Sequence, residues 1–212
     1  MTEKTAVLSD LIQYVAGRFP DGLVSHDIRA GEAVITVATG ALVGLVRFLR
    51  DDPRCLFRMC VDICGVDWPY REKRFDVVYN LLSLNHNLRL RLKIQTDEET
   101  PVPSVSEIWP TAGWFEREVW DLYGVFFSAH PDLRRILTDY GFEGHPLRKD
   151  FPLTGHVEVR YDDEEGRVAY GPVKLPQAFR TFDFLSPWEG MNRQLPGDER
   201  ASTPVPAPDE EA

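Results

Sequence analysis

The sequence lacks any long apolar run. No stretch approaches the roughly 20 apolar residues of a membrane-spanning helix, so we expect the chain to reach a membrane only through partner proteins. The first residues, MTEKTAVLSDLIQ, carry Glu3 and Asp10 and lack a basic region followed by an apolar one. They resemble neither a secretion signal nor a transit peptide. The sequence therefore predicts a location in the bacterial cytoplasm.

Positive charge is also scarce. The chain has 24 Lys and Arg against 34 Asp and Glu, a formal net charge of −10. This is the wrong sign for a surface that neutralises phosphates, so we expect no nucleic-acid partner. The glycines form no nucleotide-binding loop either, because the segment GALVG at residues 40–44 lacks a third glycine and a Lys-Ser or Lys-Thr pair.

The chain has three cysteines, which argues against a disulfide framework and fits a reducing compartment. Cys55, Cys60 and Cys64 lie close enough in sequence to raise the question of a zinc or iron–sulfur site. Their segment, CLFRMCVDICGVDW, is typical of a strand, which would place Cys60 and Cys64 about 13 Å apart on one face. That separation is too large for one metal ion. We interpret the thiols as buried structural groups, with metal ligation as the alternative.

Periodic segments predict the fold. Apolar residues recur at helical spacing from Thr5 to Phe19 and again in GALVGLVRFLRDDP, where Pro53 ends the pattern. EAVITV and the segment from Cys55 to Val66 are typical of strands. FDVVYNLLSL and LRLRLKIQ, joined by a turn at residues 85–87, predict a hairpin. Together they predict an α+β fold, with a small mixed or antiparallel sheet of three to four strands and helices on one side.

The second strand of this hairpin separates apolar from basic side chains. Leucines and an isoleucine at 88, 90, 92 and 94 alternate with Arg89, Arg91 and Lys93. The basic side is either a solvated face of an antiparallel sheet or a docking surface for an acidic partner. The sequence leaves both interpretations open.

A third helix is predicted in TAGWFEREVWDLYGV, residues 111–125. Thr111 is the expected N-terminal cap and Gly124 the expected C-terminal cap. The charged residues of this segment are Glu116, Arg117, Glu118 and Asp121. Paired carboxylates can act as acid and base. Arg117 and Asp121 are four residues apart, however, so we expect them to pair with each other on the helix surface.

Regular periodicity fades after this helix. Residues 126–190 are rich in Pro and Gly, and only HVEVRYDDEEGRVAYG within them predicts a short hairpin. They keep apolar and aromatic anchors that a small domain cannot bury alone, so we expect a long, irregular, partner-binding arm. Residues 191–212 are acidic and proline-rich, which predicts a disordered tail. The chain is thus divided into a globular domain at 1–125, the arm and the tail.

Residues 116–137 resemble a known signature. It consists of Glu116-Arg117-Glu118, Asp121-Leu122-Tyr123, His130, Arg134 and Ile136-Leu137. With this spacing it is similar to the signature of the C-subunit family of NADH:quinone oxidoreductase, respiratory complex I. The continuation LTDYGFEGHPLRKDFPLTG and the order of the earlier strands and helices resemble the same family, over roughly Leu8 to Trp188. The tail after Gly190 matches nothing in it. The undivided chain resembles the stand-alone form of the protein, without a fusion to the neighbouring large subunit.

The resemblance implies a non-catalytic structural subunit with no cofactor or metal ion of its own. It implies that FMN, the iron–sulfur clusters and the quinone pocket belong to neighbouring subunits. The D subunit would be the first partner, with the B and I subunits nearby. The whole complex would be a translocase that couples electron transfer from NADH to quinone with proton translocation. This chain would be a peripheral protein at the cytoplasmic face of the bacterial inner membrane.

The stretch from His130 to Gly155 contains two His-Pro pairs and many charged residues. One interpretation makes His130, Asp139 and His145 catalytic. The interpretation that we favour is that prolines hold the backbone extended while charged side chains bond across an interface. Ion pairs within the chain are a third alternative. The residues predicted at the partner interface are Glu116, Arg117, Glu118, Asp121, His130, Arg134, Arg135, His145, Arg148 and Asp150.

Two other functions remain as alternatives. An independent metal or redox enzyme built on the cysteines and the five histidines would have a visible absorption spectrum. The corresponding scaffold subunit of a membrane-bound hydrogenase would share the fold and the scaffold role. Only the co-purifying subunits would separate that protein from a complex I subunit.

Overall fold

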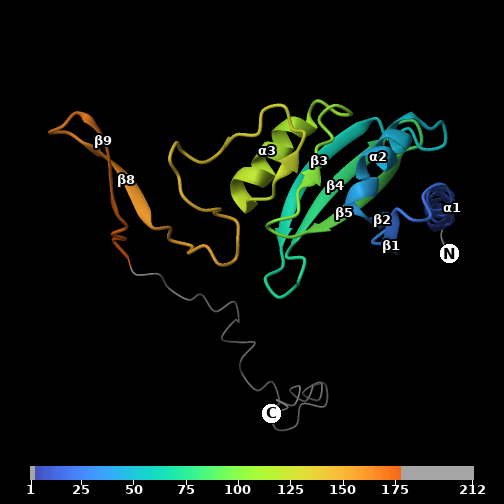
Figure 1. Ribbon diagram of the computed structural model, residues 1–212, viewed down its shortest axis with the longest axis horizontal. Helices are drawn as coiled ribbons and strands as arrows, with labels where there is room; N and C mark the ends of the chain where they lie inside the picture. Colours follow the sequence, from blue (N-terminus) through green and yellow to red (C-terminus); the bar gives the residue numbers. More distant parts are fainter. Residues whose placement is uncertain (1–2, 178–212) are drawn as a thin grey trace, which may run out of the picture. The chain divides into compact units, whose positions relative to one another are not determined.

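A computed structural model describes residues 3–177 of the chain (Figure 1). Two compact units share the chain, with the division between Val157 and Glu158. The elements of the first unit are α1 (Glu3–Arg18), β1 (Leu23–Arg29), β2 (Glu32–Val37), a 3-10 turn η1 (Thr39–Ala41), α2 (Leu42–Asp51), β3 (Met59–Asp67), β4 (Phe75–Ser83), β5 (Leu88–Thr96), β6 (Val102–Pro103), α3 (Ala112–Tyr123) and β7 (Phe127–Ser128). A hairpin of β8 (Val157–Asp162) and β9 (Arg167–Pro172) follows, as the sequence predicts.

The main sheet has five strands in the order β1-β2-β5-β4-β3. Neighbouring strands are antiparallel except for β2 and β5, which are parallel and pair Ala33 with Leu90. The predicted α+β class with a mixed sheet is confirmed. The fifth strand, β1, exceeds the predicted three to four because LVSHDIR is an exposed edge strand without a clear apolar alternation.

One hydrophobic core covers one face of this sheet. All three helices contribute to it, with Leu8 of α1, Leu45 of α2 and Val119 of α3 almost fully buried. The strands contribute their inward-pointing residues, such as Leu92 and Tyr79. The prediction of helices on one side is therefore confirmed. Among residues 3–177, no helix combines the length and the apolar character needed to cross a bilayer.

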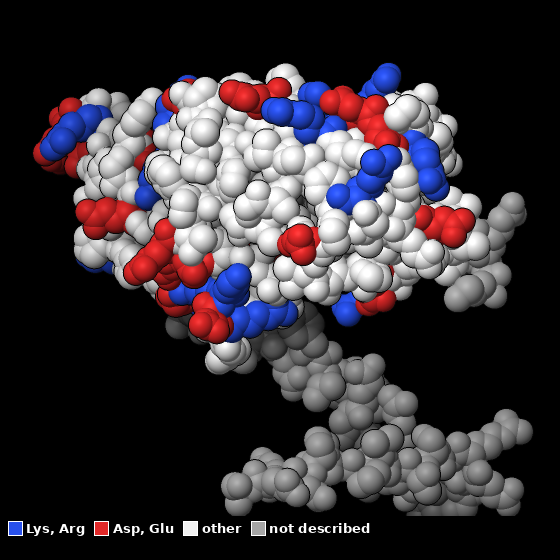
Figure 2. Space-filling view, turned by 45° about the vertical axis from the view of Figure 1, so that its right-hand side comes forward, with Lys and Arg blue, Asp and Glu red and all other residues white. Residues whose placement is uncertain are grey.

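The predicted hairpin is formed by β4 and β5. Val77 pairs with Ile94 on the core face, and the cations of β5 lie on the other face. Arg91 donates to Asn80 at 3.1 Å and forms an ion pair with Glu32 at 3.0 Å. At this position, part of the predicted basic surface is neutralised within the chain. On the face that Figure 2 shows, side chains of both signs lie next to one another around a wide uncharged area.

The cysteine segment differs from its prediction. β3 begins at Met59, so Cys55 lies before the strand, and a β-bulge interrupts the pairing between Cys60 and Asp62. The inserted residue changes the side-chain alternation. Cys60 consequently belongs to the core, whereas Cys64 points to the opposite face and is half-buried. The prediction that both thiols share one face is wrong.

Helix α3 starts and ends where predicted, but its N-terminus lacks the expected side-chain cap. Gly124 is left-handed, with φ of 78°, and its amide bonds to the carbonyl of Trp120. Thr111 occupies the N-cap position, as predicted, but it has helical backbone angles and its side chain makes no capping bond, so the predicted side-chain cap is wrong. The predicted disordered tail and the last part of the arm lie outside the described residues. The division at residue 125 stays a prediction.

Candidate interface around helix α3

Helix α3 carries three charged side chains that are buried. Glu116 and Asp121 are 0% exposed and Arg117 is 6% exposed. Burying a charge costs free energy unless the charge is paired and hydrogen-bonded. Their partners come from the loop before the helix and from residues 130–148 after it.

Asp121 binds the backbone of the segment that follows the helix. Its carboxylate accepts hydrogen bonds from the amides of Ile136, Leu137 and Thr138 at 2.8–3.0 Å. It also accepts one from the Thr138 hydroxyl at 2.6 Å and pairs with Arg135 at 2.8 Å. Burial raises the pKa of Asp121, but the hydroxyl and the amides more than offset burial, so the pKa lies well below its ordinary value. The carboxylate therefore stays ionised.

Arg117 binds the same segment as a hydrogen-bond donor, whereas Asp121 binds it as an acceptor. Its guanidinium donates to the carbonyls of Arg134 and Arg135, both at 3.0 Å, and lies 5.1 Å from the ring centre of Trp114. The predicted Arg117–Asp121 pair is wrong. An irregular segment needs acceptors for its amides and donors for its carbonyls, and these two buried side chains supply both.

Glu116 binds the loop before the helix. Its two oxygens accept from the Ser104 hydroxyl at 2.6 Å and from the Val105 amide at 2.7 Å. Burial raises the pKa of Glu116 to about 7, although these two hydrogen bonds act in the opposite direction. The imidazole of His130 lies 3.8 Å away and is 3% exposed.

Both nitrogens of His130 are engaged by backbone. Nδ1 accepts from the amide of Asp132 at 3.0 Å, so the ring proton is on Nε2, which donates to the carbonyl of Gly113 at 3.0 Å. The ring is therefore neutral in this arrangement and forms no ion pair with Glu116. His130 fixes the turn at residues 130–132 onto the start of α3.

Residues 145–148 donate hydrogen bonds to the backbone carbonyls in the last turn of α3. Helix ends leave carbonyls without intrahelical donors. The carbonyl of Asp121 accepts from Nδ1 of His145 at 2.9 Å, and that of Leu122 accepts from the amide of Leu147 at 3.1 Å. The carbonyl of Tyr123 accepts from Nε of Arg148 at 2.6 Å, where a cation also complements the helix dipole. Burial lowers the pKa of His145, which favours the neutral ring.

A second cluster holds Asp150. Arg74 binds Asp150 at 2.9 Å and Asp67 at 2.7 Å, and it lies 3.4 Å from Glu98. Glu98 also pairs with Arg148 at 3.2 Å. The hydrogen bond from Arg74 is the main cause that lowers the pKa of both Asp67 and Asp150. Residues 148–150 are thereby tied to the end of β3 and the start of β4.

The structure brings most predicted interface residues together, but through bonds inside the chain. Glu118 and Arg134 are exposed, and among residues 3–177 the side chain of Arg134 pairs with exposed Asp132 alone, at 2.9 Å. The partner-interface role of the ten residues stays a prediction. His130 and His145 hold different backbone carbonyls of α3, as described above, and the structure does not direct them at a common point.

Sequence reasoning missed several members of this site. Ser104, Asp67, Arg74 and Glu98 all lie before α3 in the sequence, and nothing local connects them to it. The useful signal is the long irregular segment itself, since its backbone groups need partners elsewhere. Within residues 3–177, no group of three or more His, Cys, Asp or Glu side chains is arranged to hold a metal ion.

Comparison with known proteins gives a consistent result. Residues 35–157 match the family model described as the respiratory-chain NADH dehydrogenase, 30 Kd subunit. A protein of Paramagnetospirillum magneticum, named as the C subunit of NADH-quinone oxidoreductase, is 63% identical over 199 residues, covering 93% of this chain and 100% of the relative. A protein of the same name from Xanthobacter autotrophicus is 59% identical over 201 residues, covering 95% and 96%.

A solved structure shares the fold. It is that of the membrane-bound sulfane sulfur reductase, an archaeal respiratory membrane complex, with a TM-score of 0.57. The likeness covers 68% of this chain and 85% of the other, with 24% sequence identity. At this identity the likeness concerns the fold alone.

Proposed function

Because this chain belongs to the C-subunit family of NADH-quinone oxidoreductase, the 30 Kd subunit of respiratory complex I, we propose that it is the structural, non-catalytic subunit of the peripheral arm of that complex. The complex is the enzyme, an NADH:quinone oxidoreductase. The part assigned to this chain is to hold neighbouring subunits in place. Electron transfer and quinone chemistry are assigned to those neighbours.

The observation that carries this proposal is the exposed apolar surface after α3. Residues 126–175 expose many large apolar side chains. They are Phe126, Leu137, Tyr140, Leu147, Leu153, Val157, Val159, Tyr161, Val168, Tyr170 and Leu175. Tyr140 is 97% and Leu153 83% exposed. Large exposed apolar patches mark interaction surfaces, and in this proposal these side chains contact a partner.

The hairpin β8–β9 exposes an apolar face that we expect a partner subunit to cover. Strand alternation places Val157, Val159 and Tyr161 on one side of β8, and they are 55–63% exposed. A hairpin of two strands is at best marginally stable in water unless a face is buried against something else. A neighbouring subunit that covers this face would stabilise both the hairpin and the assembly.

The chemistry of α3 also favours a scaffold. Glu116, Arg117 and Asp121 use their hydrogen-bonding groups on loops and backbone of this chain. The bonds of Arg117 and Asp121 shape residues 134–138, which include the exposed Leu137. In this proposal the segment is presented to partners in a defined form, which lowers the entropic cost of association.

The proposed partners follow from the family. We assign the D subunit as the first neighbour, with the B and I subunits nearby, and FMN and the iron–sulfur clusters to other subunits. The chain would be peripheral on the cytoplasmic face of the inner membrane. A scaffold in a membrane-bound hydrogenase is the rival assignment. Relatives that are 59–63% identical, each named as the C subunit of NADH-quinone oxidoreductase, favour the complex I assignment.

Substitutions on the two sides of β8 test the proposal. Val159→Ser with Tyr161→Ser should reduce the amount of complex I assembled in membranes, while NADH:quinone turnover per assembled complex stays at the wild-type level. Arg160→Ser lies on the other side of the strand and is the matched control. Complex that assembles normally but is inactive toward quinone would contradict the scaffold role.

A further inference from the structure

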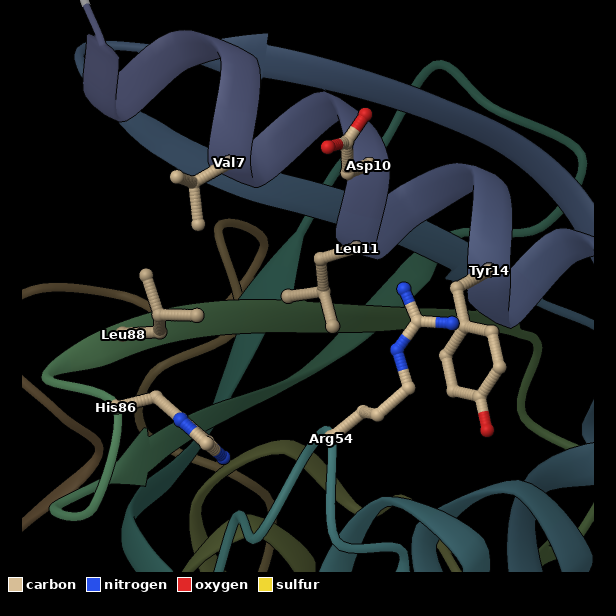
Figure 3. A pocket seen from close by; sticks show the side chains of 7 residues that line it. All are labelled: Val7, Asp10, Leu11, Tyr14, Arg54, His86 and Leu88. Atoms are coloured by element: carbon tan, nitrogen blue, oxygen red, sulfur yellow. The ribbon is translucent and has the colours of Figure 1, made fainter.

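A pocket of about 310 Å³ in the first unit lies between α1 and two loops (Figure 3). One wall is the side of α1 that carries Val7, Asp10, Leu11 and Tyr14. The opposite wall consists of Arg54, from the loop after α2, and of His86 and Leu88, from the turn between β4 and β5 and the start of β5. None of these residues takes part in the interface around α3.

The walls of this pocket are tied to one another. The hydroxyl of Tyr14 donates to Asp52 at 2.9 Å, which joins α1 to the loop after α2. Nε2 of His86 donates to the carbonyl of Pro53 at 3.0 Å, which joins the same loop to the β4–β5 turn. With Nε2 as the donor, Nδ1 of His86 is left as an acceptor. The pocket is thus preformed in the isolated chain.

The floor of the pocket is apolar. Leu11 is 6% and Leu88 9% exposed, and Val7 at the rim is 45% exposed. Figure 3 shows Val7, Leu11 and Leu88 converging on one space. A branched aliphatic group would remove these three side chains from water. The floor therefore selects for an aliphatic ligand group over a polar one.

Arg54 supplies a fixed cation above this floor. Its guanidinium carbon lies 3.9 Å from the ring centre of Tyr14, and Figure 3 shows the group directed toward α1 between Leu11 and Tyr14. Within residues 3–177, the side chain of Arg54 forms no hydrogen bond or ion pair, and the carboxylate of Asp10 likewise has none. Stacking orients the guanidinium, so less entropy is lost when it binds a carboxylate.

We propose that this pocket receives an aliphatic side chain and an adjacent carboxylate of a neighbouring subunit in the assembled complex. The carboxylate binds Arg54, the aliphatic group covers Leu11 and Leu88, and Asp10 and Nδ1 of His86 accept from backbone amides of the same segment. This inference rests on the proposed function, because it requires that the chain is part of the complex. It adds a second contact region, formed by residues other than 126–175.

The open rim favours a tethered occupant over a free small molecule. Val7, Asp10, Arg54 and His86 are all exposed, so a small molecule in the pocket would stay partly in water. Small-molecule sites usually bury most of the ligand surface. A side chain held by its own subunit loses little additional translational freedom on entering, since the rest of the interface already restrains it.

Photocrosslinking in the whole assembled complex tests the inference. A diazirine amino acid is placed at position 7 in the pocket rim and, as a control, at position 13, which is exposed on α1 outside the pocket. We expect position 7 to capture one other subunit at a peptide with an aliphatic residue next to Asp or Glu, and position 13 not to do so. Arg54→Glu should lower the captured fraction about tenfold or more, because a charge-assisted bond becomes a repulsion. Arg58→Glu, on the same loop outside the pocket, should leave the fraction unchanged.

Three outcomes would overturn the inference. Position 7 captures no other subunit in complexes that contain this chain, it captures a second copy of this chain, or Arg58→Glu lowers capture as much as Arg54→Glu. Failure of the proposed function looks different, because this chain would then be missing from purified complex I whatever residue stands at position 7.

Discussion

The carboxylate of Asp121 accepts a 2.8 Å hydrogen bond from the backbone amide of Leu137, sixteen residues further along the chain. The amides on both sides of Leu137 bind the same oxygen. One buried side chain thus accepts backbone hydrogen bonds that a neighbouring strand would accept in a sheet. It holds a segment that has little secondary structure of its own.

Removing this acceptor should loosen the segment. Asp121→Ala leaves Arg135 without its buried partner and three amides without an acceptor, so we expect a loss of about 3–5 kcal/mol in the free energy of unfolding. Denaturant unfolding of the isolated chain measures the loss, and hydrogen exchange should speed up at residues 136–138. Asp132→Ala removes an exposed carboxylate and should change little. Equal stability of the two variants would contradict the role given to Asp121.

Glu116 should make stability depend on pH. Its pKa is about 7 in the folded chain against 4.5 for the unfolded group, so between these values the folded state holds a proton that the unfolded state has lost. Stability conferred by the protonated carboxyl is therefore present below pH 4.5 and falls as pH rises toward 7, by about 3 kcal/mol in all. Glu116→Gln should remove this fall. Glu118→Gln, at an exposed position of the same helix, should retain it.

Substitution of two arginines should distinguish a role in the stability of the chain from a role in binding a partner subunit. Arg148 is 16% exposed at its side chain and bonds to Tyr123 and Glu98, whereas Arg134 is 63% exposed. Arg148→Ala should lower both the stability of the isolated chain and the yield of assembled complex. Arg134→Ala should lower only the yield. In both variants turnover per assembled complex should remain normal, and assembled but inactive complex would point to a proton or electron role.

We expect that the cysteines bind no iron. Burial raises the pKa of Cys55 and Cys60 to about 12, and it also raises that of half-buried Cys64. Thiols of this kind are poor metal ligands and slow nucleophiles at neutral pH. Cys60→Ser combined with Cys64→Ser should leave the iron content of the purified chain at zero. A brown, iron-containing preparation of the wild-type chain would contradict this prediction.

A comparison of two glycines tests the contact between the C-terminal end of α3 and residues 145–148. A Cβ at Gly124 would lie 2.5 Å from Nη2 of Arg148 and 2.6 Å from Nε2 of His145. Gly141 has a similar φ of 75°, but a Cβ there would meet nothing within 4 Å. Gly124→Ala should therefore destabilise the chain by about 1–3 kcal/mol more than Gly141→Ala does. Thermal unfolding of the two variants measures the difference, and equal effects would reduce the role of Gly124 to its backbone angle.

Local patterns were sufficient for much of the fold. The alternation in LRLRLKIQ predicts β5 and its partner β4, and the glycine at 124 predicts the end of α3. Patterns failed where one residue changes the geometry. The bulge after Cys60 inserts an unpaired residue and sends Cys64 to the other face, and alternation alone does not contain that information.

The site was less accessible to sequence reasoning. Spacing suggested that Arg117 pairs with Asp121, because i and i+4 are neighbours on a helix surface. Both side chains are instead buried and bind residues 134–138, which no local rule connects to them. Tertiary packing thus decided between two sets of partners. Family resemblance located the same residues without specifying what they bind.

The single parallel pairing in the main sheet, between β2 and β5, has a consequence for the order of folding. Strand β2 completes its pairing only after residues 90–93 have been made, whereas β4 and β5 are joined by a short turn. Pairings that are distant in sequence form slowly, since the intervening loop must first be closed. During synthesis, β1 and β2 therefore leave the ribosome before β5, the strand that pairs with the open edge of β2, and they later add to the β4–β5 hairpin.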